Sequence, residues 1–313
     1  MIGLKVKSEL NKMKIIFLGA GYCSRFIIPL VDKKAEIICT HQDKITTQKF
    51  DKNLNLKRVT FRQLIKEKES IFDGVNVLLN SIPPKHNGDL VVKNFSNIIV
   101  KKKKTINWFG YFSSTSVYGD HSGNWVNEGT ELTPNSQRGI LRKKSELQHL
   151  KFFEDHKIPI HIFRLPGIYG PGRSVIDKFK KQEVVEILKE GHFFSRVHVE
   201  DIATAIAKSL NKSTPGEIFN ICDDLPTESH KVLRYAAKLM NVKNFKSLNF
   251  DDPKISSKIK SFYNDNKRVK NEKIKKILHW TPKFRTYKLG LKNIFKSYLN
   301  ENSSSNITFS KKD

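Results

Sequence analysis

Residues 13–27 read MKIIFLGAGYCSRFI, an apolar run followed by a glycine-rich turn. The run Lys14–Leu18 is short and nearly all apolar, which predicts a strand that is buried on both faces. Gly19 permits a tight turn, and Gly21 lets a ligand approach the main chain before a helix begins. A strand, a Gly-x-Gly turn and a helix in this order are typical of the site that holds the pyrophosphate of a dinucleotide cofactor.

The residues after the second glycine depart from the usual pattern in two ways. Ser24 stands where a third glycine normally packs the helix close to the strand, and its small side chain can nearly match that role. Pro29 lies inside the expected helix and is predicted to kink it, because proline has no main-chain N–H to donate. Tyr22 and Cys23 complete the predicted cofactor-binding turn.

Apolar strands alternate with helical stretches along the chain. Strands are predicted within 35–41, 74–84, 107–116, 158–172 and 216–224, and helices within Phe61–Lys68, Asp89–Val100, Arg138–His156 and Ile176–Glu190. This alternation predicts an α/β fold with a doubly wound parallel sheet covered on both faces. We expect a first domain at 13–165, a region at 166–298 that completes the sheet and forms a substrate lobe, and a disordered tail at 299–313.

The end of the second predicted strand bears on the choice of dinucleotide. An acidic residue is expected there when the cofactor is NAD, because it binds the ribose 2′-hydroxyl. The strand instead ends with Thr40, His41 and Gln42, and Lys44 is close by. This favours NADP(H) over NAD(H), since a cation can hold the 2′-phosphate. A surface role for His41 is the alternative.

Hydroxyl side chains follow the fourth predicted strand, at Ser113, Ser114, Thr115 and Ser116. Ligands in open α/β sheets bind beyond the carboxyl ends of the strands, so these hydroxyls are expected to face the same cleft as the glycine turn. Serines that cap a strand end would explain one or two of them. Capping does not explain the VYGD, Asn-Glu and Pro-x-Ser segments that come next.

These segments resemble the extended short-chain dehydrogenase/reductase family, the NAD-dependent epimerases and dehydratases. The resemblance covers about residues 13–295 and rests on FSSTSVYGD (112–120), FRLPGIYGPGR (163–173), RVHVEDIA (196–203) and GEIFNICDD (216–224). More narrowly, RGILRKKSE (138–146) resembles an atypical bacterial branch. The resemblance implies a Rossmann-type NAD(P)-binding domain, a smaller C-terminal substrate region, and a catalytic set of Ser or Thr, Tyr and Lys.

The catalytic set is altered in this chain. The position four residues before the tyrosine of VYG is Ser114, which the resemblance implies would bind the substrate oxygen. The positions of the family's Tyr-x-x-x-Lys pair are Arg138 and Arg142, whose spacing predicts one shared helix face. Arg142 can keep the ribose-binding role, whereas Arg138 is a poor general acid because a guanidinium stays protonated. Tyr118 is a candidate replacement, although its position usually packs in the core.

Further contacts are expected around this cleft. Ser81 and Pro83 follow a strand and are expected to line the cofactor's path, unless they only form a turn. Pro166 is expected at the nicotinamide end. The positions that the resemblance places in substrate segments, each of which could instead form a surface ion pair, are Arg173, Arg196, Arg268 and Asn271.

The formal net charge of +26 raises the question of a polyanionic partner. The 57 Lys and Arg residues are spread over the whole length, and the densest run, Lys101–Lys104, falls where a solvated loop is favoured. We therefore expect no specific nucleic-acid partner. Three widely spaced cysteines predict neither a disulfide framework nor a metal site and fit a cytoplasmic location. No apolar run approaches about 18 residues, so no membrane partner is expected.

Together these features predict an NAD(P)-dependent oxidoreductase or epimerase/dehydratase-like protein. Its substrate would be a carbonyl or alcohol of a small anionic metabolite, such as a nucleotide sugar. The alternative is a dinucleotide-binding sensor or scaffold that has lost catalysis, which the two arginines favour. The resemblance is also compatible with a homodimer formed through a four-helix contact.

Overall fold

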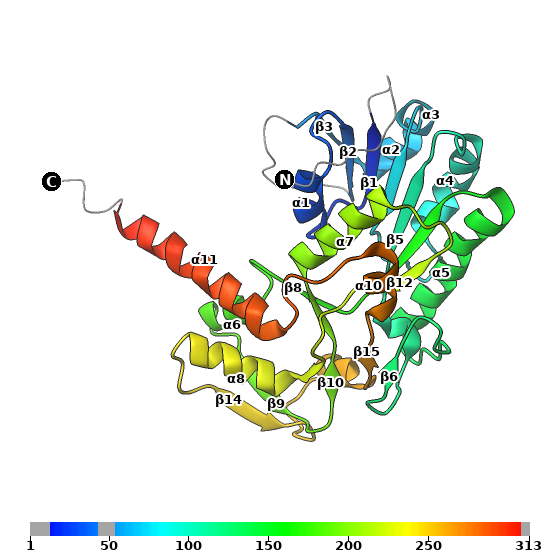
Figure 1. Ribbon diagram of the computed structural model, residues 1–313. Coiled ribbons are helices and arrows are strands. Elements are labelled where there is room, and N and C mark those ends of the chain that lie inside the picture. The colour runs from blue at the N-terminus through cyan, green and yellow to red at the C-terminus, as the bar shows by residue number, and fades with distance from the viewer. Residues whose placement is uncertain (1–12, 43–53, 308–313) are drawn as a thin grey trace.

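The computed structural model describes residues 13–42 and 54–307. Within these residues, seven strands form one parallel sheet in the order β12-β7-β5-β4-β1-β2-β3 (Figure 1). They are β1 (Lys14–Leu18), β2 (Glu36–His41), β3 (Leu56–Thr60), β4 (Val77–Asn80), β5 (Trp108–Ser114), β7 (Ile160–Leu165) and β12 (Ile218–Asn220). The order reverses between β1 and β4, which confirms the predicted Rossmann-type fold. Such a reversal opens a ligand-binding crevice at the carboxyl ends of the two strands.

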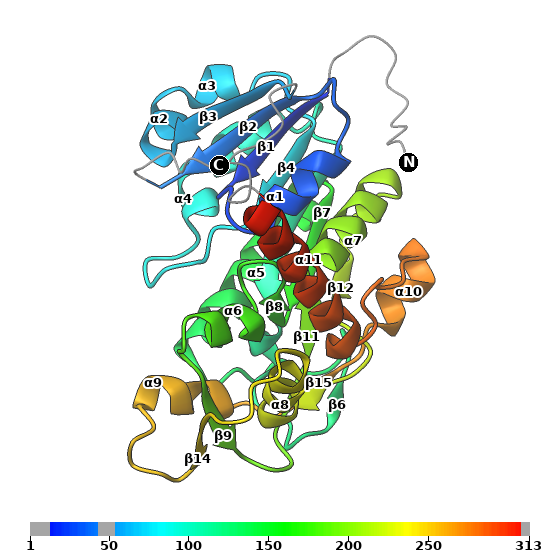
Figure 2. The ribbon, with the colours of Figure 1, turned by 90° about the vertical axis from the view of Figure 1, so that its left-hand side faces the viewer.

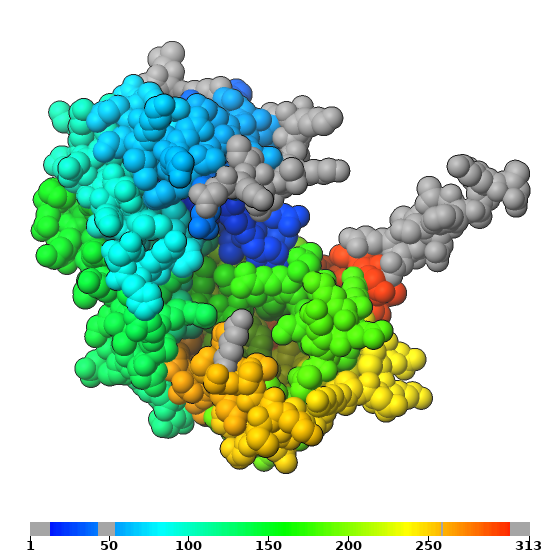
Figure 3. All heavy atoms as spheres, turned by 180° about the vertical axis from the view of Figure 1, so that it is seen from behind, coloured from blue at the N-terminus to red at the C-terminus, as the bar shows by residue number. Residues whose placement is uncertain are grey.

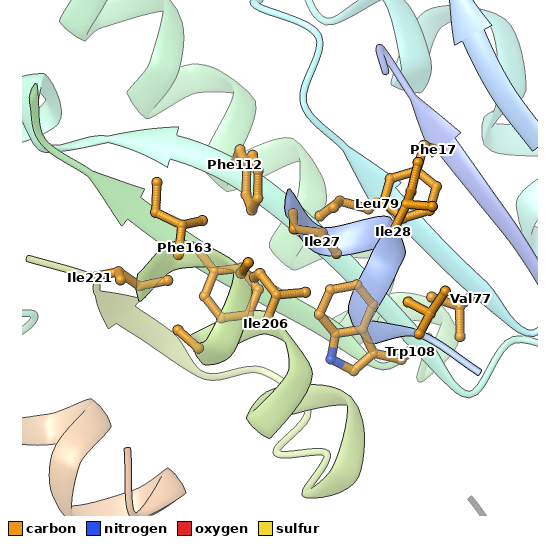
Figure 4. Close-up of a cluster of buried hydrophobic side chains, with 14 of the residues drawn as sticks. Phe17, Ile27, Ile28, Val77, Leu79, Trp108, Phe112, Phe163, Ile206 and Ile221 are labelled. Atoms are coloured by element: carbon orange, nitrogen blue, oxygen red, sulfur yellow. The ribbon is translucent and has the colours of Figure 1, made fainter. Parts of the chain in front are cut away.

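Helices cover both faces of the sheet because its strands are apolar on both sides. In β1, Ile15 and Phe17 join one hydrophobic cluster, while Ile16 and Leu18 join the other. The first cluster contains side chains of α1 (Ser24–Ile27), α7 (Val199–Asn211) and α10 (Glu272–Leu278). The second contains side chains of α2 (Phe61–Lys66), α3 (Lys68–Ile71), α4 (Leu90–Lys101) and α5 (Gln137–His156). Figure 4 shows Trp108 and Phe163 of the sheet facing Ile27 and Ile206 of the helices in the first cluster.

A smaller lobe is built from the C-terminal half of the chain. Its helices and main strand pair are α6 (Val175–Lys180), β9 (Val185–Leu188), α8 (Ser229–Leu239), β14 (Lys246–Asn249) and α9 (Ser257–Lys260). Short strand pairs connect it to the sheet region: β6 (Trp125–Val126) with β15 (Arg268–Val269), β8 (Gly167–Tyr169) with β11 (Arg196–His198), and β10 (Phe193–Phe194) with β13 (Thr227–Glu228). In Figure 2 this lobe lies at the bottom, away from β1–β3 at the top.

The predicted helix at Ile176–Glu190 is wrong in its second half. Only Val175–Lys180 is helical, and Val185–Leu188 forms strand β9, which pairs in parallel with β14. Gln182 ends the helix, because its φ of 56° lies in the left-handed region. The β-branched residues that follow suit a strand once β14 offers a partner.

The C-terminal helix α11 (Tyr287–Ile307) extends outward from the lobe (Figure 1). The prediction of a disordered tail at 299–313 is wrong as far as Ile307, because the main chain there is helical, and residues 308–313 lie outside the described part of the chain. Asn and Ser residues are modest helix formers, and a helix already anchored by packing at its first turns can continue through them. Among the described residues, no helix combines the length and the apolar character that a membrane span requires.

Candidate functional site

The glycine turn after β1 is held between its two neighbouring strands. The Gly19 N–H donates to Thr40 Oγ1 at 2.7 Å, and Ser81 Oγ donates to the Gly19 carbonyl at 2.5 Å. Gly19 has a φ of +86°, and a Cβ there would lie 2.8 Å from Cγ1 of Ile82. Only glycine fits this position without strain or displacement. The turn is thus built by residues from β1, β2 and the segment after β4.

Gly21 differs from Gly19 because it faces open space. A Cβ added to it would meet only the Gly19 carbonyl, at 3.9 Å. The Ser24 hydroxyl donates to the Gly21 carbonyl at 2.6 Å, so serine fills the place of a third glycine and also fixes the turn. The α-helix after the turn is only one turn long, and Pro29 lies in the 3₁₀ segment Ile28–Leu30 that follows, as the predicted kink requires. The uncovered main chain at Gly21 fits the approach of a pyrophosphate.

A loop of the second region lies against this turn. The Tyr22 hydroxyl donates to the carbonyl of Pro171 at 3.1 Å, and the Arg173 guanidinium lies 5.4 Å from the centre of the Tyr22 ring. A Cβ at Gly170 would be 2.5 Å from the Tyr22 hydroxyl oxygen, so glycine permits this close approach. Burial raises the pKa of Cys23 to about 11, which keeps its side chain a neutral thiol near neutral pH. Arg173 is exposed and is placed beside the predicted cofactor turn.

The end of β2 contains polar side chains that are buried. Thr40 is 1% exposed and His41 is 7% exposed, so a surface role for His41 is wrong. Burial and then the charge of Arg58 lower the pKa of His41, which makes its neutral form more stable. Arg58 belongs to β3, where it pairs in register with Cys39. The sequence did not indicate Arg58, because strand pairing and not spacing along the chain brings it near His41. The other cation expected here, Lys44, lies outside the described residues.

Ser114 ends β5 in the middle of the sheet, at the same edge as the glycine turn. Its half-buried side chain accepts a hydrogen bond from the Ser116 N–H at 3.2 Å and so caps the 3₁₀ segment η2 (Thr115–Tyr118). Helix α5 packs directly on this segment, because a Cβ at Gly139 would overlap the Ser116 carbonyl oxygen. The hydroxyl strand and the start of α5 are therefore packed against each other.

The two arginines of α5 reach in different directions, despite their i, i+4 spacing. Arg138 is exposed, and its guanidinium lies 5.6 Å from the ring centre of Phe262 in the C-terminal lobe. Arg142 is half-buried and turns toward β5, where its Nη1 donates to the Tyr111 hydroxyl at 3.1 Å and to the Phe112 carbonyl at 2.5 Å. The pair thus spans the opening from the sheet to the lobe, and Figure 3 shows the surface hollowed between the N-terminal body and that lobe.

Tyr118 does not fit the role of a replacement proton donor. Its side chain is fully buried, donates to Asn220 Oδ1 at 2.8 Å and accepts from Arg164 Nη1 at 3.0 Å. Burial raises the pKa of Tyr118 to about 12. Arg164 is in turn paired with Glu146 of α5 at 2.8 Å, and both side chains are almost inaccessible to solvent. This network anchors α5 to β7 and leaves the Tyr118 hydroxyl no exposed face for a substrate.

The predicted substrate positions of the C-terminal region are partly used by the lobe itself. Arg196 Nη1 donates to two main-chain carbonyls, each at 2.8 Å. Arg268 Nε donates to the Gly123 carbonyl at 2.7 Å. Asn271 is 5% exposed and donates to Asp224 Oδ1 at 2.9 Å, so the structure contradicts its assignment as a substrate ligand. Its place after the strand pair β6–β15 makes it a tether between that pair and the segment that follows β12.

The two predicted proline positions lie at the carboxyl edge of the sheet. Pro83 is exposed just beyond the end of β4, and Pro166 is half-buried between β7 and β8. Pro166 separates the run predicted as one strand at 158–172 into two strands that belong to different sheets. Both prolines are therefore near the crevice, at positions that a ligand along this edge would pass.

Comparison with known proteins agrees with this fold. Residues 97–222 match the NAD dependent epimerase/dehydratase family. The solved structure of a functionally unknown conserved protein from Silicibacter pomeroyi shares 34% identity, with coverage of 91% of this chain and 99% of the other and a TM-score of 0.83. The chain belongs to the NAD-dependent epimerase/dehydratase family.

Two further proteins are similar to the chain, one over part of its length and one in its fold. Protein YeeZ of Escherichia coli K12 is 36% identical over 117 residues, which are 36% of this chain and 38% of YeeZ, so the chain spans about two fifths of that relative. The dTDP-glucose 4,6-dehydratase of Bacillus anthracis, solved in complex with NAD, is 19% identical and has a TM-score of 0.74. That alignment covers 93% of this chain and 98% of the dehydratase, and it shows a shared fold.

Proposed function

We propose that the protein binds an NAD(P)(H) dinucleotide in the crevice between β1 and β4 and uses it to act on a small anionic metabolite. The observation that carries this proposal is the pair of glycines at the turn. Gly19 is locked by its neighbours, whereas the main chain of Gly21 is open at the switch point of the sheet. The pyrophosphate would lie against Gly21, with Ser81 and Pro83 along the path toward the nicotinamide.

NADP(H) is the preferred cofactor in this proposal. The last residues of β2 are Thr40 and His41, where a dinucleotide-binding strand that prefers NAD has an acidic residue. The Arg58 charge acts on His41 from the neighbouring strand, which supports a phosphate at this end of the cleft. Replacement of Arg58 by alanine would reduce the ratio of NADPH to NADH affinity, whereas an unchanged ratio would exclude a contact between Arg58 and the phosphate.

The arginines suggest the substrate class. Arg138, Arg142 and Arg173 stay cationic at any ordinary pH, and arginine binds phosphates and carboxylates through paired N–H donors. The dehydratase from Bacillus anthracis acts on a sugar joined to a nucleoside diphosphate, and such an anionic carbonyl compound would suit this cleft. Ser114 would donate a hydrogen bond to the reacting oxygen, and Arg138 would polarise that oxygen without transferring a proton. The nicotinamide, when bound, would supply or accept the hydride.

A specific observation favours a second candidate, a dinucleotide-binding sensor without catalysis. Arg138 stands at the position of the family's acid/base tyrosine, and Tyr118 is enclosed by Asn220 and Arg164. A guanidinium does not exchange protons with a substrate near neutral pH. The cleft would then bind the dinucleotide and report its redox state through the lobe that contacts Arg138.

The oxidation of NADPH in the presence of a carbonyl panel tests these proposals. The panel contains nucleotide-linked keto sugars and simple ketones, and absorbance at the nicotinamide band follows the reaction. Catalysis predicts turnover with an anionic member and a loss of about tenfold in kcat/KM for Arg138→Ala, since one charge-assisted contact is removed. Tight NADPH binding without turnover of any member would refute catalysis and support the sensor.

A further inference from the structure

A chain of buried polar side chains leads from Arg142 into the interior beneath α4 and α5. The Arg142 guanidinium donates to the Tyr111 hydroxyl at 3.1 Å, and the neighbouring Ser145 hydroxyl lowers the pKa of Tyr111. Ser145 Oγ donates to Asp89 Oδ2 at 2.6 Å. Tyr111, Ser145 and Asp89 are each at most 2% exposed. The Tyr111 hydroxyl that holds Arg142 therefore lies in a buried polar cluster with Ser145 and Asp89.

The direction of each hydrogen bond in this chain follows from the available protons. Ser145 has one hydroxyl proton and gives it to Asp89. A guanidinium has donors only, so the Tyr111 hydroxyl oxygen accepts from Arg142. Burial raises the pKa of Tyr111, which keeps the phenol protonated as this arrangement needs. The Tyr111 hydroxyl is therefore a fixed acceptor aimed at Arg142.

The far end of the chain is saturated and rigid. Asp89 Oδ1 accepts from the N–H groups of Val91 and Val92 at the start of α4, and Oδ2 accepts from Asn80 at 3.4 Å in addition to Ser145. The ring of His149 stacks on the Tyr111 ring with centres 4.1 Å apart. Nε2 of that histidine accepts from Asn80, so Nδ1 carries the proton that is donated to the Ser145 carbonyl.

We propose that Tyr111 is a positioning residue that holds Arg142 against the end of β5, so that the other donors of the guanidinium meet the ribose end of a bound dinucleotide. Arg142 Nη1 is occupied by Tyr111 and the Phe112 carbonyl, whereas Nε and Nη2 have no hydrogen-bond partner in the described part of the chain. An arginine side chain has many rotamers, and a fixed acceptor removes most of that freedom before the ligand arrives. This inference rests on the proposed dinucleotide site.

A second phenol–guanidinium pair beside the same helix provides a matched control. Tyr118 and Arg164 are joined by a 3.0 Å hydrogen bond, and the guanidinium is closed off by Glu146. Like Tyr111→Phe, the Tyr118→Phe variant removes one buried phenol hydroxyl. The guanidinium that it contacts, that of Arg164, has no donor left for a ligand. Both variants are expected to lower the melting temperature by similar amounts, so a difference in cofactor affinity reports position and not general stability.

The test is a double-mutant cycle on the dissociation constant of NADPH, measured below the melting temperature of every variant. Tyr111→Phe is expected to weaken NADPH binding roughly three- to tenfold, since one net hydrogen bond that orders Arg142 is lost. In the Arg142→Ala background the same substitution is expected to change the constant by less than twofold, because its effect acts through Arg142. Tyr118→Phe is expected to leave the constant unchanged.

The outcomes distinguish a failure of the positioning role of Tyr111 from a failure of the proposed dinucleotide site. Binding by the wild type with equal effects of Tyr111→Phe in both backgrounds overturns the positioning role alone. An equal loss of affinity for Tyr118→Phe would also overturn it, because general destabilisation would then explain both. Absence of NADPH and NADH binding by the wild type overturns the dinucleotide site and the positioning role together.

Discussion

The glycine turn after β1 and the start of α5 lie at the same carboxyl edge of the sheet, yet they face the cleft in different ways. The turn is held by neutral hydrogen bonds, such as those of Thr40 and Ser81 to Gly19, and it exposes bare main chain at Gly21. The start of α5 presents the side chain of Arg138 and keeps its anchor, the Arg164–Glu146 ion pair, in the interior. The proposed cofactor site and the proposed substrate site therefore have separate structural supports.

The largest expected effect is on the α5 side, for Glu146→Ala. The substitution leaves the Arg164 guanidinium buried without its counter-charge, which is expected to cost about 3–5 kcal/mol of unfolding free energy. Chemical denaturation measures this loss. Glu154→Ala is the control, because Glu154 is exposed on the same helix. A loss below about 1 kcal/mol for Glu146→Ala would show that the ion pair does not anchor α5.

The next effect is on the turn side, for Gly19→Ala. Alanine would have to adopt a φ of +86°, and its Cβ would lie 2.8 Å from Cγ1 of Ile82. We therefore expect a loss of about 2–4 kcal/mol in the free energy of unfolding. Gly74→Ala separates strain from overlap, since Gly74 has a φ of +65° with no atom within 4 Å. Thermal unfolding should show a loss of about 1 kcal/mol for Gly74→Ala. Equal losses would mean that the contact with Ile82 is unimportant.

A third prediction is that Gly21→Val weakens cofactor binding and leaves the stability of the fold unchanged. A Cβ at this exposed position meets only the Gly19 carbonyl oxygen, at 3.9 Å, so the melting temperature should barely change. It would fill the space of the pyrophosphate, and NADPH affinity should fall at least about a hundredfold. Fluorescence titration of NADPH measures this fall. Gly129→Val, at another exposed glycine, should retain affinity, and retained affinity in Gly21→Val would remove the pyrophosphate from this turn.

The last prediction is a small effect on stability for Arg138→Tyr, which restores the residue type of the family at the exposed start of α5. The unfolding free energy should stay within about 0.5 kcal/mol of the wild type, because Arg138 makes one contact with an exposed ring. Turnover of an anionic carbonyl substrate should fall, since its cationic partner is lost. Higher turnover in the variant would contradict a catalytic Arg138 and favour the sensor.

The glycine turn was predictable from the sequence because its structure is local. Strand β1 has the predicted bounds Lys14–Leu18, and Pro29 interrupts the helix after the turn as expected. Similarly, Ser136 caps α5 by accepting from the Gly139 N–H, so the start of that helix differs from the prediction by one residue. Main-chain geometry and capping depend on residues a few positions apart, and a sequence displays those directly.

The surroundings of the arginines could not be predicted, because they depend on residues far apart in the chain. Arg142 meets Tyr111, 31 residues earlier, and Arg58 acts on His41 across two paired strands. Asn271 was assigned to the substrate through the resemblance, whereas tertiary contacts use it as a tether. The i, i+4 spacing places the two arginines on one face of α5. Their guanidinium groups nevertheless point to different partners, Tyr111 for Arg142 and Phe262 for Arg138.

Calorimetric titration of the wild-type protein with NADPH and with NADH tests whether a dinucleotide binds at the open glycine. We expect one dinucleotide to bind per chain, with NADPH the tighter ligand, and the heat signal to be lost in Gly21→Val. The absence of binding by both dinucleotides to the folded wild-type protein would contradict this expectation.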